Sequence, residues 1–175
     1  MIKITTPLTQ KQILNLKAGD QVSLTGMIYT ARDQAHLRLC QLLAKGRELP
    51  FDLKGQAIYY CGPTQTPKGK IIGSCGPTTS RRMDELTLPL LKNGLAAMIG
   101  KGNRSREVLQ AVKKYRGIYF ITYAGCGALL SKYVRKAKVI GFPDLGPEAI
   151  RRLEVKDFPL IVAIDCKGKN IFPRI

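Results

Sequence analysis

The feature that most constrains the fold is the alternation of short apolar runs with helical patterns in the second half of the chain. The apolar runs cover residues 95–99, 117–122 and 160–165, each long enough for one buried strand. Patterns of helical spacing separate them, including one that ends near Tyr115. Strands that are joined through helices pair in parallel by right-handed crossovers, so we expect an α/β layer from this half.

The first 75 residues differ, because they are typical of closely spaced strands around a helix. Residues 22–29 alternate apolar and polar side chains, and residues 57–62 and the pair Ile71-Ile72 are also apolar. Residues 31–44 have helical spacing instead. We expect this strand-rich portion to pack on the α/β layer within a single domain that spans residues 1–175.

The net charge of the chain limits the classes of partner that it suits, but it does not select one class. The 29 Lys and Arg residues outnumber the 12 Asp and Glu residues, which gives a formal net charge of +17. Nucleic acid, an anionic membrane surface and small anionic substrates all suit such a balance. The basic residues are scattered along the sequence rather than gathered in a tail, so we expect most of them to form a solvated surface.

The five cysteines are widely spaced and contain no C-x-x-C pair. This pattern argues against a disulfide framework and against a local zinc or iron-sulfur site, and it is typical of the reducing cytoplasm. The sequence also shows no secretory leader and no apolar run long enough to span a bilayer. We therefore expect a soluble cytoplasmic protein that binds no metal through its own cysteines.

Residues 75–84 form a loop that is typical of anion binding. An apolar pair ends in Gly-Pro, and hydroxyl side chains and two arginines then lead into a helical pattern. The free amides of a first helical turn favour negative charge, and the hydroxyl and guanidinium groups add further donors. The same residues also suit an ordinary helix start with Thr79 or Ser80 as the N-cap.

Two further loops belong to the same class. In an open α/β sheet, ligands bind beyond the carboxyl ends of the strands, and residues 76–82, 100–105 and 124–127 fall there. Lys101 lies between two glycines, so it is placed to bind a carboxylate or a phosphate, with solvated surface as the alternative. Neither a Walker A sequence nor a G-x-G-x-x-G follows any predicted strand, and no nucleotide is implied.

Arg32 and His36 are four residues apart near the start of the helix at 31–44. This spacing places both side chains on one side of that helix. A basic, solvent-exposed helix face is the alternative to a functional pair. His36 is the one histidine of the chain, which makes it a candidate for proton transfer.

Together, three segments resemble signature sequences of the beta subunit, or C-terminal domain, of the class I iron-sulfur fumarate hydratase and L-tartrate dehydratase family. They are residues 25–36, 76–84 and 100–105, with further matches at 4–8, 144–150 and 154–159. The resemblance covers nearly the whole chain in order. It implies an α/β fold of the swivelling β/β/α type, with three layers, a largely parallel central sheet and a smaller strand-rich layer.

The resemblance also implies a reaction and a partner. In this family a 4Fe-4S cluster lies on the alpha subunit, where one iron is open to act as a Lewis acid. The chain would then work with a cluster-bearing alpha subunit, in a heterotetramer, on a small dicarboxylate and not on nucleic acid. The implied reaction is the reversible hydration of fumarate to malate. Residues 102–105 look more like fumarases, whereas residues 124–126 and 164–165 are similar to tartrate dehydratases, so L-tartrate is the alternative substrate.

The resemblance assigns substrate binding by position within the matched motifs. Arg32, Arg82 and Lys101 would bind carboxylates, since an arginine can do so through two parallel hydrogen bonds. Thr79 would assist them. Arg81 stands where the family often has a small residue, so spacing alone leaves either Arg81 or Arg82 as the carboxylate ligand, and we favour Arg82.

Proton transfer is assigned in the same way to Thr78, with an acidic residue of the alpha partner assisting it. A threonine hydroxyl is a poor base at its ordinary pKa, so this role needs nearby positive charge and the cluster. His36 is the second candidate for proton transfer.

Two other classes of function stay open from the sequence: a basic nucleic-acid-binding module, whose affinity would fall steeply with salt, and a scaffold whose site has decayed.

Overall fold

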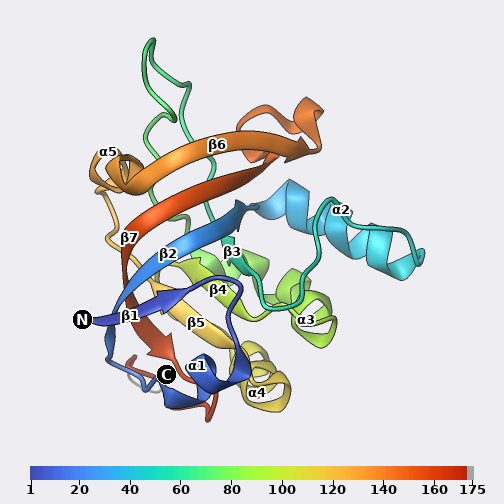
Figure 1. Cartoon of the computed structure of the whole chain (residues 1–175). Helices are drawn as coiled ribbons and strands as arrows, with labels where there is room; N and C mark the ends of the chain where they lie inside the picture. The colour runs from blue at the N-terminus through green and yellow to red at the C-terminus, as the bar shows by residue number, and fades with distance from the viewer. Residues whose placement is uncertain (173–175) are drawn as a thin grey trace.

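The computed structural model describes residues 1–172, which form a mixed sheet of seven strands with helices against it (Figure 1). In chain order the elements, with η marking 3-10 helices, are β1 (Ile2–Thr5), α1 (Gln10–Asn15), β2 (Gln21–Thr30), α2 (Asp33–Ala44), β3 (Ala57–Tyr59), η1 (Ser80–Met83), α3 (Asp84–Lys92), β4 (Ala97–Gly100), α4 (Arg106–Tyr115), β5 (Ile118–Ile121), α5 (Gly127–Leu130), η2 (Ser131–Tyr133), β6 (Val134–Gly141), η3 (Pro143–Glu148) and β7 (Ile150–Ile164).

The sheet curls on itself. Its strand order is β1-β2-β3-β4-β5-β7-β6, and β2 also pairs with β7, so β2, β3, β4, β5 and β7 close a ring. Neighbours from β1 to β5 pair in parallel, which confirms the predicted α/β class. β7 is antiparallel to β2, β5 and β6. The prediction that the last strand joins in parallel is therefore wrong, because β6 leads into β7 through the short η3 and not through a crossover helix.

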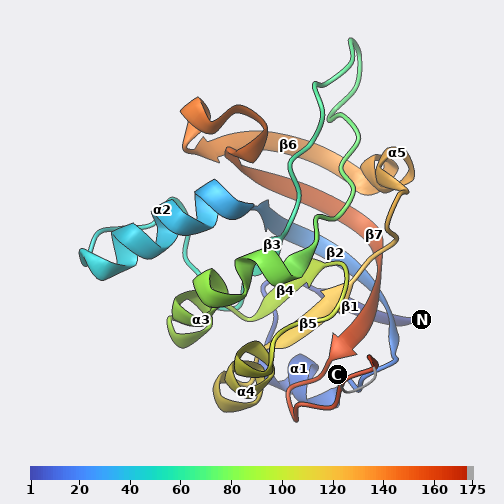
Figure 2. The same cartoon turned by 180° about the vertical axis from the view of Figure 1, so that it is seen from behind.

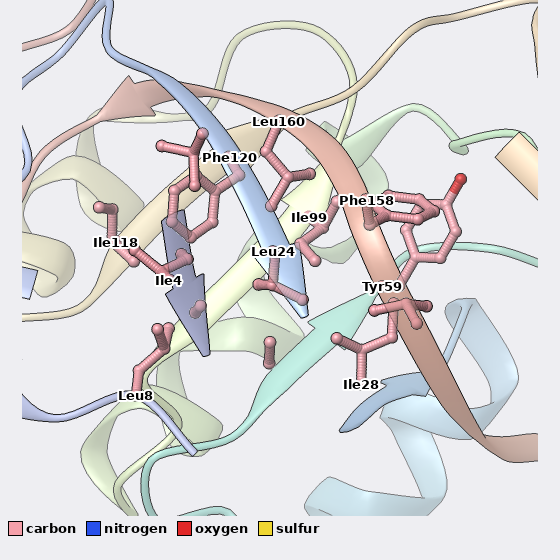
Figure 3. Packing of buried hydrophobic residues seen from close by; sticks show 14 of the residues in the cluster. Ile4, Leu8, Leu24, Ile28, Tyr59, Ile99, Ile118, Phe120, Phe158 and Leu160 are labelled. Carbon is pink, nitrogen blue, oxygen red and sulfur yellow. The ribbon is translucent and has the colours of Figure 1, made fainter. Parts of the chain in front are cut away.

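The helices α2, α3 and α4 gather on one side of the sheet in both views (Figures 1 and 2). Side chains of β3, β4 and β5 alternate between two hydrophobic clusters, as the period of a strand requires. One cluster fills the inside of the curled sheet (Figure 3), and the other lies against the helices. The first receives Tyr59, Ile99 and Phe120, and the second receives Ile58, Met98 and Tyr119. Each such fully buried side chain contributes about 1.5–3 kcal/mol.

The chain between β3 and η1 leaves the body as a two-armed ribbon, which rises beyond β6 in Figures 1 and 2. Its arms are paired at both ends: Thr78 N–H donates to the Tyr60 carbonyl at 2.7 Å, and Thr64 N–H donates to the Ser74 carbonyl at 3.0 Å. The prediction of a strand at Ile71 is wrong. Ile71 lies in a bend with 51% of its surface exposed, because an isolated apolar pair has no sheet neighbour to cover it.

Two other sequence predictions need correction. The helical pattern expected between the runs at 117–122 and 160–165 gives only a single α-helical turn, since α5 ends at Leu130 and β6 already begins at Val134. The strand-rich layer was expected from the first 75 residues alone, whereas β7, which pairs with β2, and β6, which pairs with β7, also belong to it. Pro89 lies inside α3, which continues to Lys92.

Candidate functional site

The loop that carries Lys101 is joined directly to the start of η1. Ser80 N–H donates to the Lys101 carbonyl at 3.1 Å, and Lys101 N–H donates back to Ser80 Oγ at 3.1 Å. The buried Tyr119 hydroxyl contacts the same Ser80 Oγ at 2.9 Å and the Gly102 carbonyl at 2.8 Å. Thr79 and Lys101 also form an isolated parallel bridge. Two of the three predicted ligand loops therefore meet as one unit.

A buried ion pair fastens the other end of the Lys101 loop. Arg104 Nε lies 2.6 Å from Asp84 Oδ1, and Ser105 N–H donates to Asp84 Oδ2 at 2.6 Å. The Arg104 guanidinium also reaches the Tyr60 hydroxyl and Thr87 Oγ1, at 3.3 and 3.2 Å. Burial opposes the charged form of Arg104, but Tyr60 and Asp84 beside it raise its pKa overall. Arg104 is therefore a structural cation, and it holds the loop against the first turn of α3.

A carboxylate joins the two predicted arginines. Arg82 contacts Asp33 through two nitrogens, Nε and Nη2, each 3.1 Å from an Asp33 oxygen. Arg32 Nη2 lies 3.6 Å from Asp33 Oδ2 and 3.7 Å from Glu148 Oε1. Arg81 has no ion pair within residues 1–172, whereas Arg82 shares Asp33 with Arg32.

Arg32 has an unused donor. Its Nε is buried and has no hydrogen-bond partner among the described residues, and both of its carboxylate contacts are longer than a hydrogen bond. The base of the ribbon packs onto this side chain, since a Cβ at Gly62 would lie 2.9 Å from Arg32 Cδ. A buried donor without a partner is costly, so an acceptor such as a ligand carboxylate would be favourable here.

Thr78, Thr79 and Lys101 present free polar groups at this place. Thr78 and Lys101 are half-buried and Thr79 is exposed. Thr79 precedes η1, but its side chain makes no capping hydrogen bond. Within residues 1–172, Lys101 makes no ion pair either. The Thr79 hydroxyl therefore does not cap η1, as the alternative of an ordinary helix start would require.

His36 lies inside the protein rather than on a basic face. Its ring is fully buried, meets the Tyr60 ring edge-on at 5.1 Å, and contacts the Arg32 carbonyl through Nδ1 at 2.9 Å. Burial, together with the charge of Arg104, lowers the pKa of His36 from 6.5 to about 4. Arg32 is the N-cap residue that precedes α2, and His36 contacts its backbone carbonyl and not its guanidinium.

The third predicted loop, at residues 124–127, does not meet Lys101. It packs instead against the returning arm of the ribbon, where Cys75 N–H donates to the Gly127 carbonyl at 3.1 Å. Sequence reasoning also missed the two carboxylates at the arginines, Asp33 and Glu148. Both lie within segments that resembled the family motifs, and an acidic residue directly after Arg32 was the available signal.

The described residues do not fit a 4Fe-4S cluster. Within residues 1–172, no three His, Cys, Asp or Glu side chains lie close enough together to hold a metal ion. Cys61, Cys75 and Cys166 are buried in the hydrophobic core, where they pack as small apolar side chains. In the same part of the chain, no helix is long and apolar enough to cross a membrane.

Comparison with known proteins identifies the family of this chain. The model of the family described as "Fumarase C-terminus" matches residues 1–175. The chain belongs to this family. A Methanocaldococcus jannaschii protein provisionally named L(+)-tartrate dehydratase subunit beta is 41% identical over 174 residues, which is 96% of this chain and 89% of that protein.

Two longer members of the Fumarase C-terminus family are also similar. The anaerobic class I fumarate hydratase of Escherichia coli is 40% identical over 94% of this chain and 30% of that enzyme. The mitochondrial fumarate hydratase 1 of Leishmania major is 36% identical over 100% of this chain and 33% of that enzyme. The chain thus spans about a third of the fumarate hydratases that it matches and most of the tartrate dehydratase subunit.

Proposed function

We propose that the chain is the beta subunit of a hydro-lyase that hydrates fumarate reversibly to malate, together with a cluster-bearing alpha subunit. The observation that carries the proposal is that Arg32 and Arg82 share Asp33, while the loop with Lys101 is paired with Thr79 and bonded to Ser80 at the start of the η1 that carries Arg82. Family membership and the names of the relatives support the reaction class. The name of the Methanocaldococcus jannaschii relative, a subunit beta, supports a partner subunit.

The cations bind the substrate carboxylates. Arg32 is the primary ligand, because its buried Nε has no acceptor of its own and a carboxylate would provide one. Lys101 contributes a point charge from a loop that Ser80 holds in place, and Arg82 contributes the free end of its guanidinium. Asp33 and Glu148 balance the charges of Arg32 and Arg82, and Lys101, which has no ion pair within residues 1–172, adds a positive charge for an anionic ligand.

Thr78 moves the proton at the reacting carbon. Its backbone is fixed, because Thr78 N–H donates to the Tyr60 carbonyl at 2.7 Å, and this leaves the hydroxyl at the base of the ribbon. The neighbouring cations favour the more negative form of the hydroxyl, and an acidic residue of the alpha subunit would accept the proton. The alpha subunit would also hold the 4Fe-4S cluster, whose open iron supplies Lewis acid chemistry. His36 is too deeply buried to reach a substrate, so we assign it to fixing the backbone of Arg32.

Two neighbouring arginines offer a matched test of the residue roles. Arg82→Ala should lower kcat/KM for fumarate by about 10- to 100-fold, the range expected for one charge-assisted hydrogen bond. Arg81→Ala changes an exposed arginine one position away and should stay within about twofold of wild type. The assay is steady-state hydration by the anaerobically reconstituted complex. Equal losses in both variants would contradict the assignment.

L-tartrate is the second candidate substrate, and one comparison favours it. The match to the Methanocaldococcus jannaschii protein named a tartrate dehydratase subunit includes 89% of that protein and 96% of this chain. Steady-state rates on fumarate, malate and L-tartrate with the same complex separate the two candidates. A higher kcat/KM for L-tartrate would show that L-tartrate, and not fumarate, is the substrate.

We further propose a heterotetramer of the two subunits, working in the cytoplasm, where the five free cysteines stay reduced. Native mass spectrometry of the complex tests the assembly.

A further inference from the structure

Asp33 occupies an unusual place at the start of α2. An acidic residue in the first helical turn commonly stabilises the helix by facing its free N–H groups. Here another residue does this, because Glu148 Oε2 accepts the Gln34 N–H at 2.8 Å. Within residues 1–172, Asp33 accepts no hydrogen bond from a backbone N–H. Its two oxygens face Arg82 instead, at 3.1 Å each, with Arg32 at 3.6 Å.

The geometry of the contact leaves Arg82 ready for a ligand. A guanidinium has five N–H donors, arranged on a side edge and an end edge. Asp33 takes the side edge, formed by Nε and Nη2 of Arg82. Nη1 of Arg82 has no partner among the described residues. The end edge is therefore free for a second, parallel pair of hydrogen bonds of the kind that a carboxylate accepts.

We propose that Asp33 is a positioning residue, which holds the side edge of Arg82 so that its end edge meets a substrate carboxylate beside Arg32. The Arg82 side chain needs such a restraint, because half of its surface is exposed and a long free side chain samples many rotamers. The contact also fixes η1 relative to the first turn of α2. This inference rests on the proposed function, since it concerns the carboxylate site of that reaction.

Asp33→Asn is the direct test, because it keeps the shape and removes the charge. An amide offers one oxygen and one NH₂ group, so it cannot accept two hydrogen bonds from Arg82 side by side. We expect kcat for fumarate hydration to fall about tenfold, since the reacting geometry is lost. KM should stay within about twofold of the wild-type value. A more mobile Arg82 binds the dicarboxylate less well, but the loss of the Asp33 charge removes a repulsion of the dicarboxylate. Asp33→Glu should recover part of the loss in kcat.

The chain offers a matched control in Asp144. Asp144 also receives two hydrogen bonds from one arginine of α2, Arg38, and it lies on the same η3 that carries Glu148. Asp144→Asn therefore removes an equivalent pair without touching Arg32 or Arg82. Its kcat and KM should match those of wild type.

A second measurement does not depend on activity. In the isolated chain, the NMR signal of the Arg82 Nε–H should exchange slowly with water in wild type and in Asp144→Asn, and rapidly in Asp33→Asn. Unchanged exchange in Asp33→Asn would overturn the proposal, as would a lower KM with unchanged kcat, which would make Asp33 a competitor of the substrate. If the wild-type complex hydrates neither substrate while Asp33→Asn still frees the Arg82 signal, the proposed reaction fails and the positioning of Arg82 stands.

Discussion

The buried His36 makes the stability of the fold depend on pH in a predictable way. Its ring is fully buried, with Nδ1 directed at the Arg32 carbonyl and Nε2 without a partner among residues 1–172. Burial, with the charge of Arg104, lowers its pKa from 6.5 to about 4, although the carbonyl contact and Asp33 oppose this shift. The folded state therefore holds His36 neutral in a range where the unfolded chain binds a proton.

The direction follows from which state binds the proton more tightly. Above the ordinary pKa of 6.5, His36 is neutral in both states and the folded state loses nothing. As the pH falls from 6.5 towards 4, protons stabilise the unfolded chain only. With these two pKa values, the free energy of unfolding should be about 2 kcal/mol lower at about pH 5 than at about pH 7.5.

The assay is urea denaturation followed by far-ultraviolet circular dichroism at both pH values, on wild type and on His36→Gln. Because the chain has one histidine, the variant removes the histidine contribution completely. Carboxylates titrate alike in the two proteins, so the difference between their pH dependences isolates His36. If both proteins lose the same free energy within about 0.5 kcal/mol, the burial argument for His36 is refuted.

Two further substitutions test the packing that holds the Lys101 loop, with thermal and urea unfolding as the measurements. Arg104→Met should destabilise the fold by about 3–5 kcal/mol, because it leaves Asp84 buried without its cation. The exposed control Lys136→Ala should cost less than about 1 kcal/mol, and equal effects would contradict the structural role of Arg104. Gly100→Ala should cost about 1–3 kcal/mol, since its Cβ would lie 1.9 Å from Ser80 Oγ; an unchanged midpoint would show that this contact is not tight.

Much of the fold could be predicted from periodicity. The runs at 57–62, 95–99 and 117–122 became β3, β4 and β5, because strands with both faces buried are apolar throughout. The direction of β7 was predicted wrongly, since β6 leads into β7 through the short η3 and not through a crossover helix. The strand at Ile71 failed for a related reason: two apolar residues do not show whether another strand will cover them.

The candidate site could likewise be predicted only in part from the sequence. Because ligands bind beyond strand ends, the sequence alone predicted that the loops with Thr79 and Lys101 lie at one site, and the two residues form a bridge in the structure. The contacts of Asp33 with Arg82 and of Glu148 with the start of α2 span 49 and 114 residues of sequence, and only the folded chain shows them. The catalytic and binding roles stay predictions until variants are measured.

The measurement that tests the central claim most directly is fumarate hydration by the chain reconstituted anaerobically with a cluster-bearing alpha subunit, in wild type and in Lys101→Ala. We predict that wild type consumes fumarate and that Lys101→Ala loses about 10- to 100-fold in kcat/KM while it binds the alpha subunit normally. An exposed-lysine control, Lys45→Ala, should retain wild-type rates. Wild-type rates in Lys101→Ala would contradict the account of the carboxylate site, and a complex that turns over neither fumarate nor L-tartrate would contradict the proposed function.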